Sequence, residues 1–132
     1  LAGQAASGKG ADSQDSVTAA HGAAKALAAQ FGTVVAITGP TDYLTDGTQE
    51  AQVAGGSSLM PKVTALGCSQ TALMGAYGAI GPAFDAALAA LAHFKVAGAS
   101  AGKLAKGPGS FQVQFLDALA ETQPADFSKV IR

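Results

Sequence analysis

The only cysteine of the chain lies in a short segment of small residues, VTALGCSQTA, at positions 63–72. An apolar extended stretch precedes this segment, and Ser69 and Thr71 mark what the pattern predicts to be the start of a helix. Free amides at a helix N-terminus, with the positive end of the helix dipole behind them, suit phosphate groups or a transferring phosphoryl group. A thiol in that first turn can act as a nucleophile or accept a proton. A buried cysteine that only fills space is the alternative interpretation of Cys68, and spacing alone favours it.

A second candidate for phosphate chemistry is Thr38, in the sequence AITG. This threonine comes at the carboxyl end of TVVAIT, an apolar, β-branched run that predicts a strand. Ligands of open parallel α/β sheets bind at the carboxyl ends of the strands, so the Thr38 hydroxyl is placed to meet a phosphate. The alternative is a β-branched residue that merely ends a strand, and the residue types alone favour it.

Two aspartates and two histidines could suggest a metal site, but their settings favour structural roles. Asp46 is part of Asp46-Gly47, a dipeptide typical of hairpin turns, and Asp42 lies four residues before it. A structural role in the turn is therefore predicted for both. His21 and His93 lie in predicted helices without a second ligand at metal spacing, which indicates surface or satisfied core histidines. We therefore expect no metal ligands among these residues.

Composition favours one soluble globular domain. The chain has 132 residues, of which 48% are apolar and 13% charged, and its formal net charge is −1. The eight Lys and Arg are scattered singly, which argues against nucleic-acid binding. One cysteine excludes an internal disulfide, and neither a signal peptide pattern nor an apolar run of about 18 residues is present. A cytoplasmic protein without a membrane partner is the default expectation.

The elements that must position these residues follow from periodicity and from Gly and Pro. A helix is expected to end at Phe31 before Gly32, and a strand covered on both faces should follow at 33–38. Helix, glycine turn and strand together indicate half of a parallel α/β unit. The other expected elements are a hairpin within 42–53, helices over 69–80 and 83–104 separated by Gly81-Pro82, a loop at 106–110, a half-exposed strand at 111–115, and one or two short helices to the end. In the loop, Gly107 and Gly109 are expected to adopt φ values that other residues avoid.

The chain also offers few strands for a parallel sheet. Strand 33–38 needs parallel neighbours on both sides, yet only about three other strand candidates exist, two of them in the hairpin. The sequence begins at Leu1 rather than Met. We therefore expect these residues to be part of a larger domain.

Five segments resemble motifs of the hydroxyethylthiazole kinases, members of the ribokinase-like superfamily, in the family's order and spacing across essentially the whole chain. GKGADSQDS resembles the family's GRGVDS, VVAITGPTDYLTDG its VVAVTG-x-x-DYVTDG, and LMPKVTALGC its LMP-x-VTG-x-GC. VTALGCSQTALMGAYGAI is similar to its VT-G-x-GC with the following helix of small residues, and KGPGSFQVQFLDAL to its KGPGSF and LDAL. Lys9 and Asp12, in the first segment, are interpreted as a loop anchor and a helix cap.

The resemblance implies an α/β, ribokinase-like three-layer fold with a mainly parallel sheet flanked by helices, of which only the later part is present. Residues 1–132 would form the C-terminal part of a single kinase domain. The implied reaction transfers the γ-phosphoryl group of ATP, with Mg²⁺, to the primary alcohol of 4-methyl-5-(2-hydroxyethyl)thiazole in thiamine biosynthesis or salvage. A homotrimer with active sites at subunit interfaces is also implied. The alternatives are a kinase for another small alcohol, such as hydroxymethylpyrimidine, and a non-catalytic nucleotide-binding remnant.

The same resemblance assigns roles by position. Backbone amides around Leu66 and Gly67 would hold the transferring phosphoryl group, and Thr38 would contact the nucleotide. Cys68 occupies the place of the aspartate that serves as the presumed base in most of the superfamily. Ala65 stands where the family has a glycine that contacts the thiazole.

The chain departs from the family pattern in two ways. The Cβ of Ala65 costs about 1 kcal/mol or more if the turn requires a positive φ, and it could hinder close approach of the substrate. The earlier half of the family pattern is missing, including the thiazole-ring segment, an arginine that meets the nucleotide and an Asn-x-x-Glu motif associated with Mg²⁺. We expect the isolated chain to be inactive and to expose a sheet edge.

Overall fold

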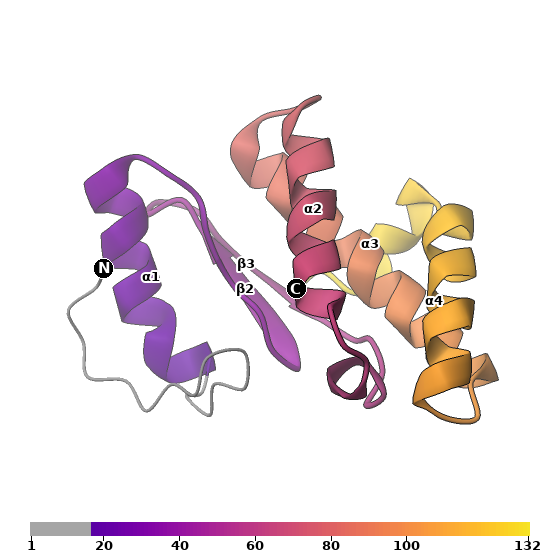
Figure 1. Ribbon diagram of the computed structural model, residues 1–132. Helices are drawn as coiled ribbons and strands as arrows, with labels where there is room; N and C mark the ends of the chain where they lie inside the picture. Colours follow the sequence, from indigo (N-terminus) through magenta and orange to yellow (C-terminus); the bar gives the residue numbers. More distant parts are fainter. Residues whose placement is uncertain (1–16) are drawn as a thin grey trace.

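The computed structural model describes residues 17–132 and arranges them as a small sheet between helices (Figure 1). The helix α1 contacts β1 and β2, whereas α3 contacts β2 and β3 and also packs against α2 and α4. The elements in chain order are α1 (Val17–Phe31), β1 (Val35–Ile37), β2 (Thr41–Thr45), β3 (Glu50–Ala54), the 3-10 helix η2 (Met60–Lys62), α2 (Leu66–Gly78), α3 (Ala83–Leu104), α4 (Pro108–Glu121) and the 3-10 helix η3 (Pro124–Lys129).

The helix α1 ends where the sequence predicts. Its last residue is Phe31, and Gly32 follows with a φ of 59°. The amide of Thr33 then donates a hydrogen bond of 3.1 Å to the carbonyl of Ala28, which closes the helix end over the left-handed glycine. The roles predicted for Lys9 and Asp12 fall outside the described residues.

The strand predicted at 33–38 is present, but it is shorter and less buried than expected. β1 covers Val35–Ile37, is half-buried along its length, and lies at the edge of a sheet with the order β1-β2-β3. Both pairs in this sheet are antiparallel. Because its residues are only half-buried, the expectation that β1 is covered on both faces is wrong for residues 17–132. The expected parallel neighbours are also absent among the described strands, where β1 pairs with β2 alone.

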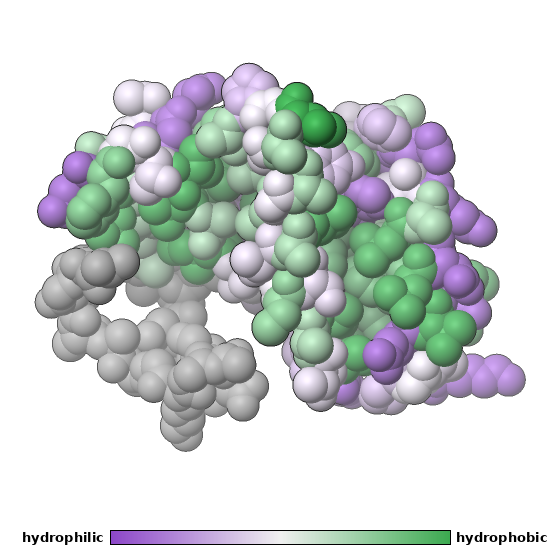
Figure 2. Space-filling view, turned by 45° about the horizontal axis from the view of Figure 1, so that its top comes forward, coloured by the Kyte–Doolittle hydropathy of each residue, from purple (hydrophilic) through white to green (hydrophobic). Residues whose placement is uncertain are grey.

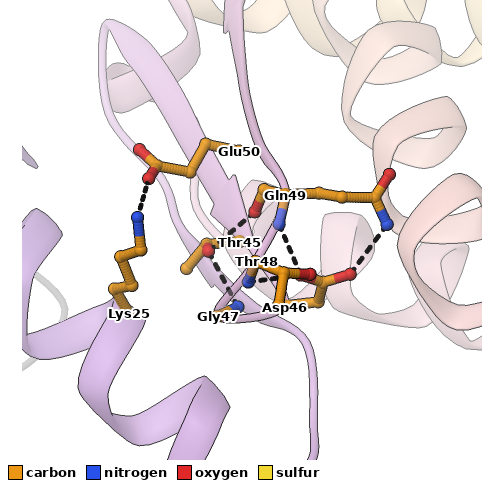
Figure 3. Close-up of polar contacts among 7 residues, drawn as sticks. All are labelled: Lys25, Thr45, Asp46, Gly47, Thr48, Gln49 and Glu50. Atoms are coloured by element: carbon orange, nitrogen blue, oxygen red, sulfur yellow. Dashed lines mark hydrogen bonds and ion pairs between the residues drawn. The ribbon is translucent and has the colours of Figure 1, made fainter.

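The predicted hairpin is confirmed as β2 and β3, joined by residues 46–49 (Figure 3). In this loop, Oδ1 of Asp46 accepts hydrogen bonds from the amide and the hydroxyl of Thr48, both 2.8 Å, and from the amide of Gln49 at 2.7 Å. Its Oδ2 accepts a fourth from the side-chain amide of Gln49 at 2.8 Å. These bonds hold the pKa of the Asp46 carboxyl well below its ordinary value. Turn chemistry, as predicted, is the role of Asp46.

Two of the three long helices after the hairpin match the sequence prediction. The helix α3 has the predicted bounds, Ala83–Leu104, and Gly81-Pro82 separates it from α2. The helix predicted over 69–80 is α2, which begins three residues earlier, at Leu66.

The strand predicted at 111–115 is wrong, because these residues lie inside the helix α4. Phe111, Phe115 and Ala118 are all buried, and their spacing places them on one helical face rather than one strand face. The loop predicted at 106–110 is also wrong in part, since α4 begins at Pro108. Proline is a favoured residue in the first turn of a helix, so KGPGS contains a helix start that the FQVQF alternation obscured. Gly107 has an extended φ of −179° and Gly109 is not among the glycines with a positive φ, so their predicted special backbone is wrong.

The core forms on both sides of α3. Toward α4, Phe94 meets Phe115 edge to face, with 4.8 Å between ring centroids. Toward the sheet, Leu91 packs with Leu44 and Val53 in a second buried cluster. Because α3 contributes to both clusters, it fixes the position of the strands relative to the other helices.

Some large apolar side chains remain at the surface, and they gather partly on the side of the molecule where α4 lies (Figure 2). They are Phe31, Ile80, Leu104, Val113 and Leu116. Among the described helices, none has the length and apolarity needed to cross a membrane.

Candidate active site

The turn before α2 has the strained backbone that the sequence raised as a possibility. Ala65, the residue that precedes the first helical turn, has a φ of 68°. It is the one non-glycine residue with a positive φ in the part of the chain that the structure describes. A left-handed conformation is disfavoured for a residue with a Cβ by about 1–2 kcal/mol. The condition under which Ala65 would cost stability is therefore met.

The first amides of α2 are free to bind a ligand. The first helical hydrogen bond runs from the amide of Ser69 to the carbonyl of Ala65, at 2.9 Å, and no side chain caps the helix. Within residues 17–132, the amides of Leu66, Gly67 and Cys68 have no hydrogen-bond acceptor. Three unpaired donors at the positive end of a helix of 13 residues form a site suited to an anion.

The hydroxyls that follow this turn do not compete for that site. Ser69 donates to the carbonyl of Ala65 at 3.0 Å, and Thr71 donates to the carbonyl of Gly67 at 3.1 Å. Both hydroxyls therefore bond back along the helix rather than to its free amides.

Cys68 lies in the first turn of α2 and is exposed. A cysteine that fills a core is buried, whereas Cys68 is not buried among residues 17–132, and its catalytic role stays a prediction. The thiol and the free amides belong to the same helical turn, as the spacing predicts.

Thr38 is exposed and directly follows β1, which ends at Ile37. The next two residues, Gly39 and Pro40, lead into β2. The amide of Gly39 donates a hydrogen bond of 2.8 Å to Oδ1 of Asp42, which closes the turn immediately after Thr38. The predicted position at the carboxyl end of a strand is confirmed, whereas a ligand contact of Thr38 stays a prediction.

Asp42 has a tertiary role beyond the turn chemistry predicted for it. Its side chain is 1% exposed and forms an ion pair of 3.1 Å with Lys95 of α3. Oδ2 of Asp42 also accepts a long hydrogen bond, 3.4 Å, from the side-chain amide of Gln70 in α2. Burial raises the pKa of the Asp42 carboxyl, and Lys95 and the Gly39 amide offset part of that rise.

Lys95 and Gln70 are the residues of this region that the sequence prediction missed. Lys95 lies in α3 within the stretch ALAALAHFKVAGASAG, where it is the one Lys, Arg, Asp or Glu. A charged residue in the middle of an otherwise apolar helix is almost never fully buried unless paired, and this was the available signal. Nothing in the local sequence distinguishes Gln70 from an exposed helical glutamine.

The two histidines have the structural roles predicted for them. Nδ1 of His93 lies 2.9 Å from the hydroxyl of Tyr77, and its Nε2 lies 2.8 Å from the carbonyl of Leu119, so both ring nitrogens are satisfied. The ring of His21 stacks on Tyr43 with 3.8 Å between centroids.

The described residues do not offer a ligand set for Mg²⁺. Residues 17–132 contain no group of three or more His, Cys, Asp or Glu side chains that could hold a metal ion. Asp42, the carboxylate connected to the Thr38 turn, is already engaged by Lys95.

A cavity of about 330 Å³ lies between α3, the end of α4 and η3. Its lining includes Lys103, Glu121 and Lys129, and it includes none of the predicted site residues. The cavity is therefore separate from the candidate site.

Comparison with known proteins shows which family the chain belongs to. Residues 1–124 match the hydroxyethylthiazole kinase family. The chain belongs to this family. Over 132 residues it is 78% identical to a hydroxyethylthiazole kinase of Roseobacter denitrificans, and over 124 residues it is 57% identical to one of Cereibacter sphaeroides.

A solved structure shows the same fold. The hydroxyethylthiazole kinase protein from Pyrococcus horikoshii superposes with a TM-score of 0.81 at 34% sequence identity, over 87% of this chain. This similarity confirms the predicted ribokinase-like α/β fold class. The chain spans about half the length of the proteins it matches: 51% of the Roseobacter denitrificans kinase, 47% of the Cereibacter sphaeroides kinase and 46% of the Pyrococcus horikoshii chain.

Proposed function

We propose that the protein containing this chain transfers the γ-phosphoryl group of ATP to the primary alcohol of hydroxyethylthiazole. Membership of the hydroxyethylthiazole kinase family supports the reaction. The structural observation that carries the proposal is the start of α2, where the unpaired amides of 66–68 share one helical turn with the exposed thiol of Cys68. Phosphoryl transfer requires mainly positioning and charge stabilisation, and this arrangement can supply both.

Each residue of the turn has a part in the proposed reaction. The amides of Leu66 and Gly67 hold the transferring phosphoryl group, because they point donors toward the N-terminal end of the helix. Cys68 lies beside them as the position that receives the proton of the substrate alcohol. Ala65 contacts the thiazole, and the hydroxyl of Thr38 binds a nucleotide phosphate. The positive helix end stabilises the negative charge that spreads over the phosphoryl oxygens.

The remaining parts of the proposal concern the whole protein. Residues 1–132 form the C-terminal part of a single kinase domain, and the other half of that domain supplies the rest of the active site. Mg²⁺ accompanies ATP, and the protein is a cytoplasmic homotrimer with active sites at subunit interfaces.

A chimera tests whether residues 1–132 support the reaction when a related kinase supplies the other half of the domain. Residues 1–132 replace the matching half of the Roseobacter denitrificans kinase, which is 78% identical over this segment. We expect release of ADP with hydroxyethylthiazole and none with hydroxymethylpyrimidine as the acceptor. Release with hydroxymethylpyrimidine alone would favour a kinase for another small alcohol, and release with neither, from a folded chimera, would indicate a non-catalytic remnant.

The role of Cys68 has its own test in the same chimera. Cys68→Ser should lower kcat by about 10²-fold, the range in which loss of general acid–base help falls. Ala72→Ser is the matched control, since Ala72 is also exposed on α2 but lies one turn further along. Equal turnover of Cys68→Ser and the parent would remove the thiol from the mechanism.

A further inference from the structure

We propose that Asp42, Lys95 and Gln70 are positioning residues of the phosphoryl-transfer site. Together with Gly39 they form a cluster of four residues that we call the buried junction. The junction fixes the turn at Thr38 relative to the free amides of α2. The inference rests on the proposed function, and it concerns residues that do not themselves touch the substrates.

The ammonium group of Lys95 is fully used inside the junction. Its Nζ lies 3.1 Å from Oδ1 of Asp42 and donates hydrogen bonds to the carbonyls of Gly39, at 2.5 Å, and Pro40, at 3.3 Å. A lysine ammonium has three protons, so these three acceptors satisfy it. The Lys95 side chain is 6% exposed. This cation therefore holds the protein together locally and is not free to meet a phosphate.

Residues of the junction form hydrogen bonds with the backbone of Gly39, next to Thr38. The amide of Gly39 donates to Asp42, and the carbonyl of Gly39 accepts from Lys95. Both polar groups of the residue after Thr38 are therefore bound by the two members of one buried ion pair. Because rotation of that peptide would break a bond to a buried charge, the position of Thr38 is restricted.

The same carboxylate also holds α2. Gln70 is the one buried residue of α2, and its side-chain amide donates to Asp42 at 3.4 Å. Gln70 lies one helical turn beyond Leu66, so it ties the first turns of α2 to Asp42. The turn at Thr38 and the start of α2 are thus both held by Asp42, although Asp42 and Gln70 are 28 residues apart in sequence.

Two glycines after β3 lie beside the stem of Lys95. A Cβ on Gly56 would lie 3.4 Å from Cδ of Lys95, and a Cβ on Gly55 would lie 3.9 Å from its Cβ. Both glycines have positive φ values, 83° and 127°, which side chains rarely adopt. The backbone after β3 therefore passes close to Lys95 as it runs toward η2.

The test compares three variants of the chimera. The double variant Asp42→Asn with Lys95→Met removes both charges and so avoids an unpaired buried ion. Gln70→Met removes only the link to α2 and leaves the ion pair intact. The matched control is Tyr77→Phe, which removes a contact between α2 and α3 at Tyr77 and His93, away from the junction. Thermal midpoints, kcat, and KM for ATP and for hydroxyethylthiazole are measured for each.

A positioning role predicts a specific kinetic pattern. In the double variant kcat/KM for ATP should fall about tenfold or more, since a small misplacement of reacting groups has large effects on rate. Gln70→Met should show a loss in the same direction of about threefold. KM for hydroxyethylthiazole should change little in both variants, and Tyr77→Phe should lower only the thermal midpoint.

The outcomes separate this inference from the proposed function. If the parent chimera does not phosphorylate hydroxyethylthiazole, the proposed function fails and the inference falls with it. If the parent is active and both junction variants keep its kcat/KM for ATP, the junction is only structural and the inference is overturned. A double variant that does not fold leaves the decision to Gln70→Met, whose unchanged kcat/KM would also overturn it.

Discussion

Two aspartates at opposite ends of the strand β2 have contrasting surroundings. Asp46, after the end of the strand, makes its four hydrogen bonds to Thr48 and Gln49, which are two and three residues away. Asp42, near the start, is 1% exposed and reaches Gln70 and Lys95, from helices that follow much later in the chain. The pKa of the Asp46 carboxyl is lowered by its hydrogen bonds, whereas burial raises that of Asp42.

The contrast distinguishes a loop that satisfies its own polar groups from the region around the candidate site. The hairpin loop satisfies its own polar groups with neighbouring residues, so its conformation is locally favourable. The region around the candidate site instead contains buried charges, free helical amides and the strained backbone of Ala65. Strain and unpaired groups of this kind persist where the surrounding structure holds them, and they concentrate at functional sites.

The largest expected effect is the loss of stability when the buried ion pair of Asp42 and Lys95 is broken. Lys95→Met alone leaves the Asp42 carboxylate buried without its partner, which should destabilise the chimera by about 3–5 kcal/mol. Lys25→Met, which removes the exposed pair of 2.5 Å between Lys25 and Glu50, should change stability little. Chemical denaturation of both variants checks this, and comparable losses would mean that burial does not distinguish the two pairs.

A second effect concerns the hairpin end. Gly47 has a φ of 96°, and a Cβ there would lie 3.0 Å from the backbone nitrogen of Ala29 in α1. Gly47→Ala should therefore destabilise the chimera by about 1–2 kcal/mol, from the left-handed backbone and the contact with α1. Turnover per folded molecule should stay at the parent value, because the loop lies outside the candidate site. A fall in kcat at full folding would contradict the separation of the two regions.

Replacing alanine by glycine at position 65 should have a smaller effect and should stabilise the chimera. Ala65→Gly relieves the Cβ at a φ of 68°, which should stabilise the chimera by about 1 kcal/mol, less the added entropy of an unfolded glycine. It should also lower KM for hydroxyethylthiazole if the Cβ hinders approach of the substrate. Denaturation and steady-state kinetics measure both, and no gain in either would dismiss the concern about Ala65.

The smallest effect is the pH dependence of the hairpin. Because the folded pKa of Asp46 is lowered, its stabilising contribution is fully present above the unfolded pKa of about 3.9 and is lost as the pH falls toward the folded value. Asp46→Asn should lose that contribution at neutral pH and differ less from the parent below about pH 3. Denaturation midpoints of parent and variant at both pH values test this, and a constant difference would exclude the ionised carboxylate as the cause.

Local patterns were sufficient for much of the fold. The end of α1, the hairpin around Asp46-Gly47 and the bounds of α3 were predictable because Gly, Pro and Asp-Gly act on the residues beside them. The helix α4 was not predictable from FQVQF, since alternation over five residues fits both a strand and the start of an amphipathic helix. The contact of Phe115 with Phe94 of α3 decides between them.

The candidate site divides in the same way. The sequence by itself determined the turn from Ala65 to Cys68, its place at a helix start and the family to which it belongs, because these depend on neighbouring residues and their order. Only the tertiary structure decided that Ala65 is left-handed, that Cys68 is exposed, and that Asp42 pairs with Lys95. A buried ion pair depends on which distant segments the core brings together, and no local pattern carries that information.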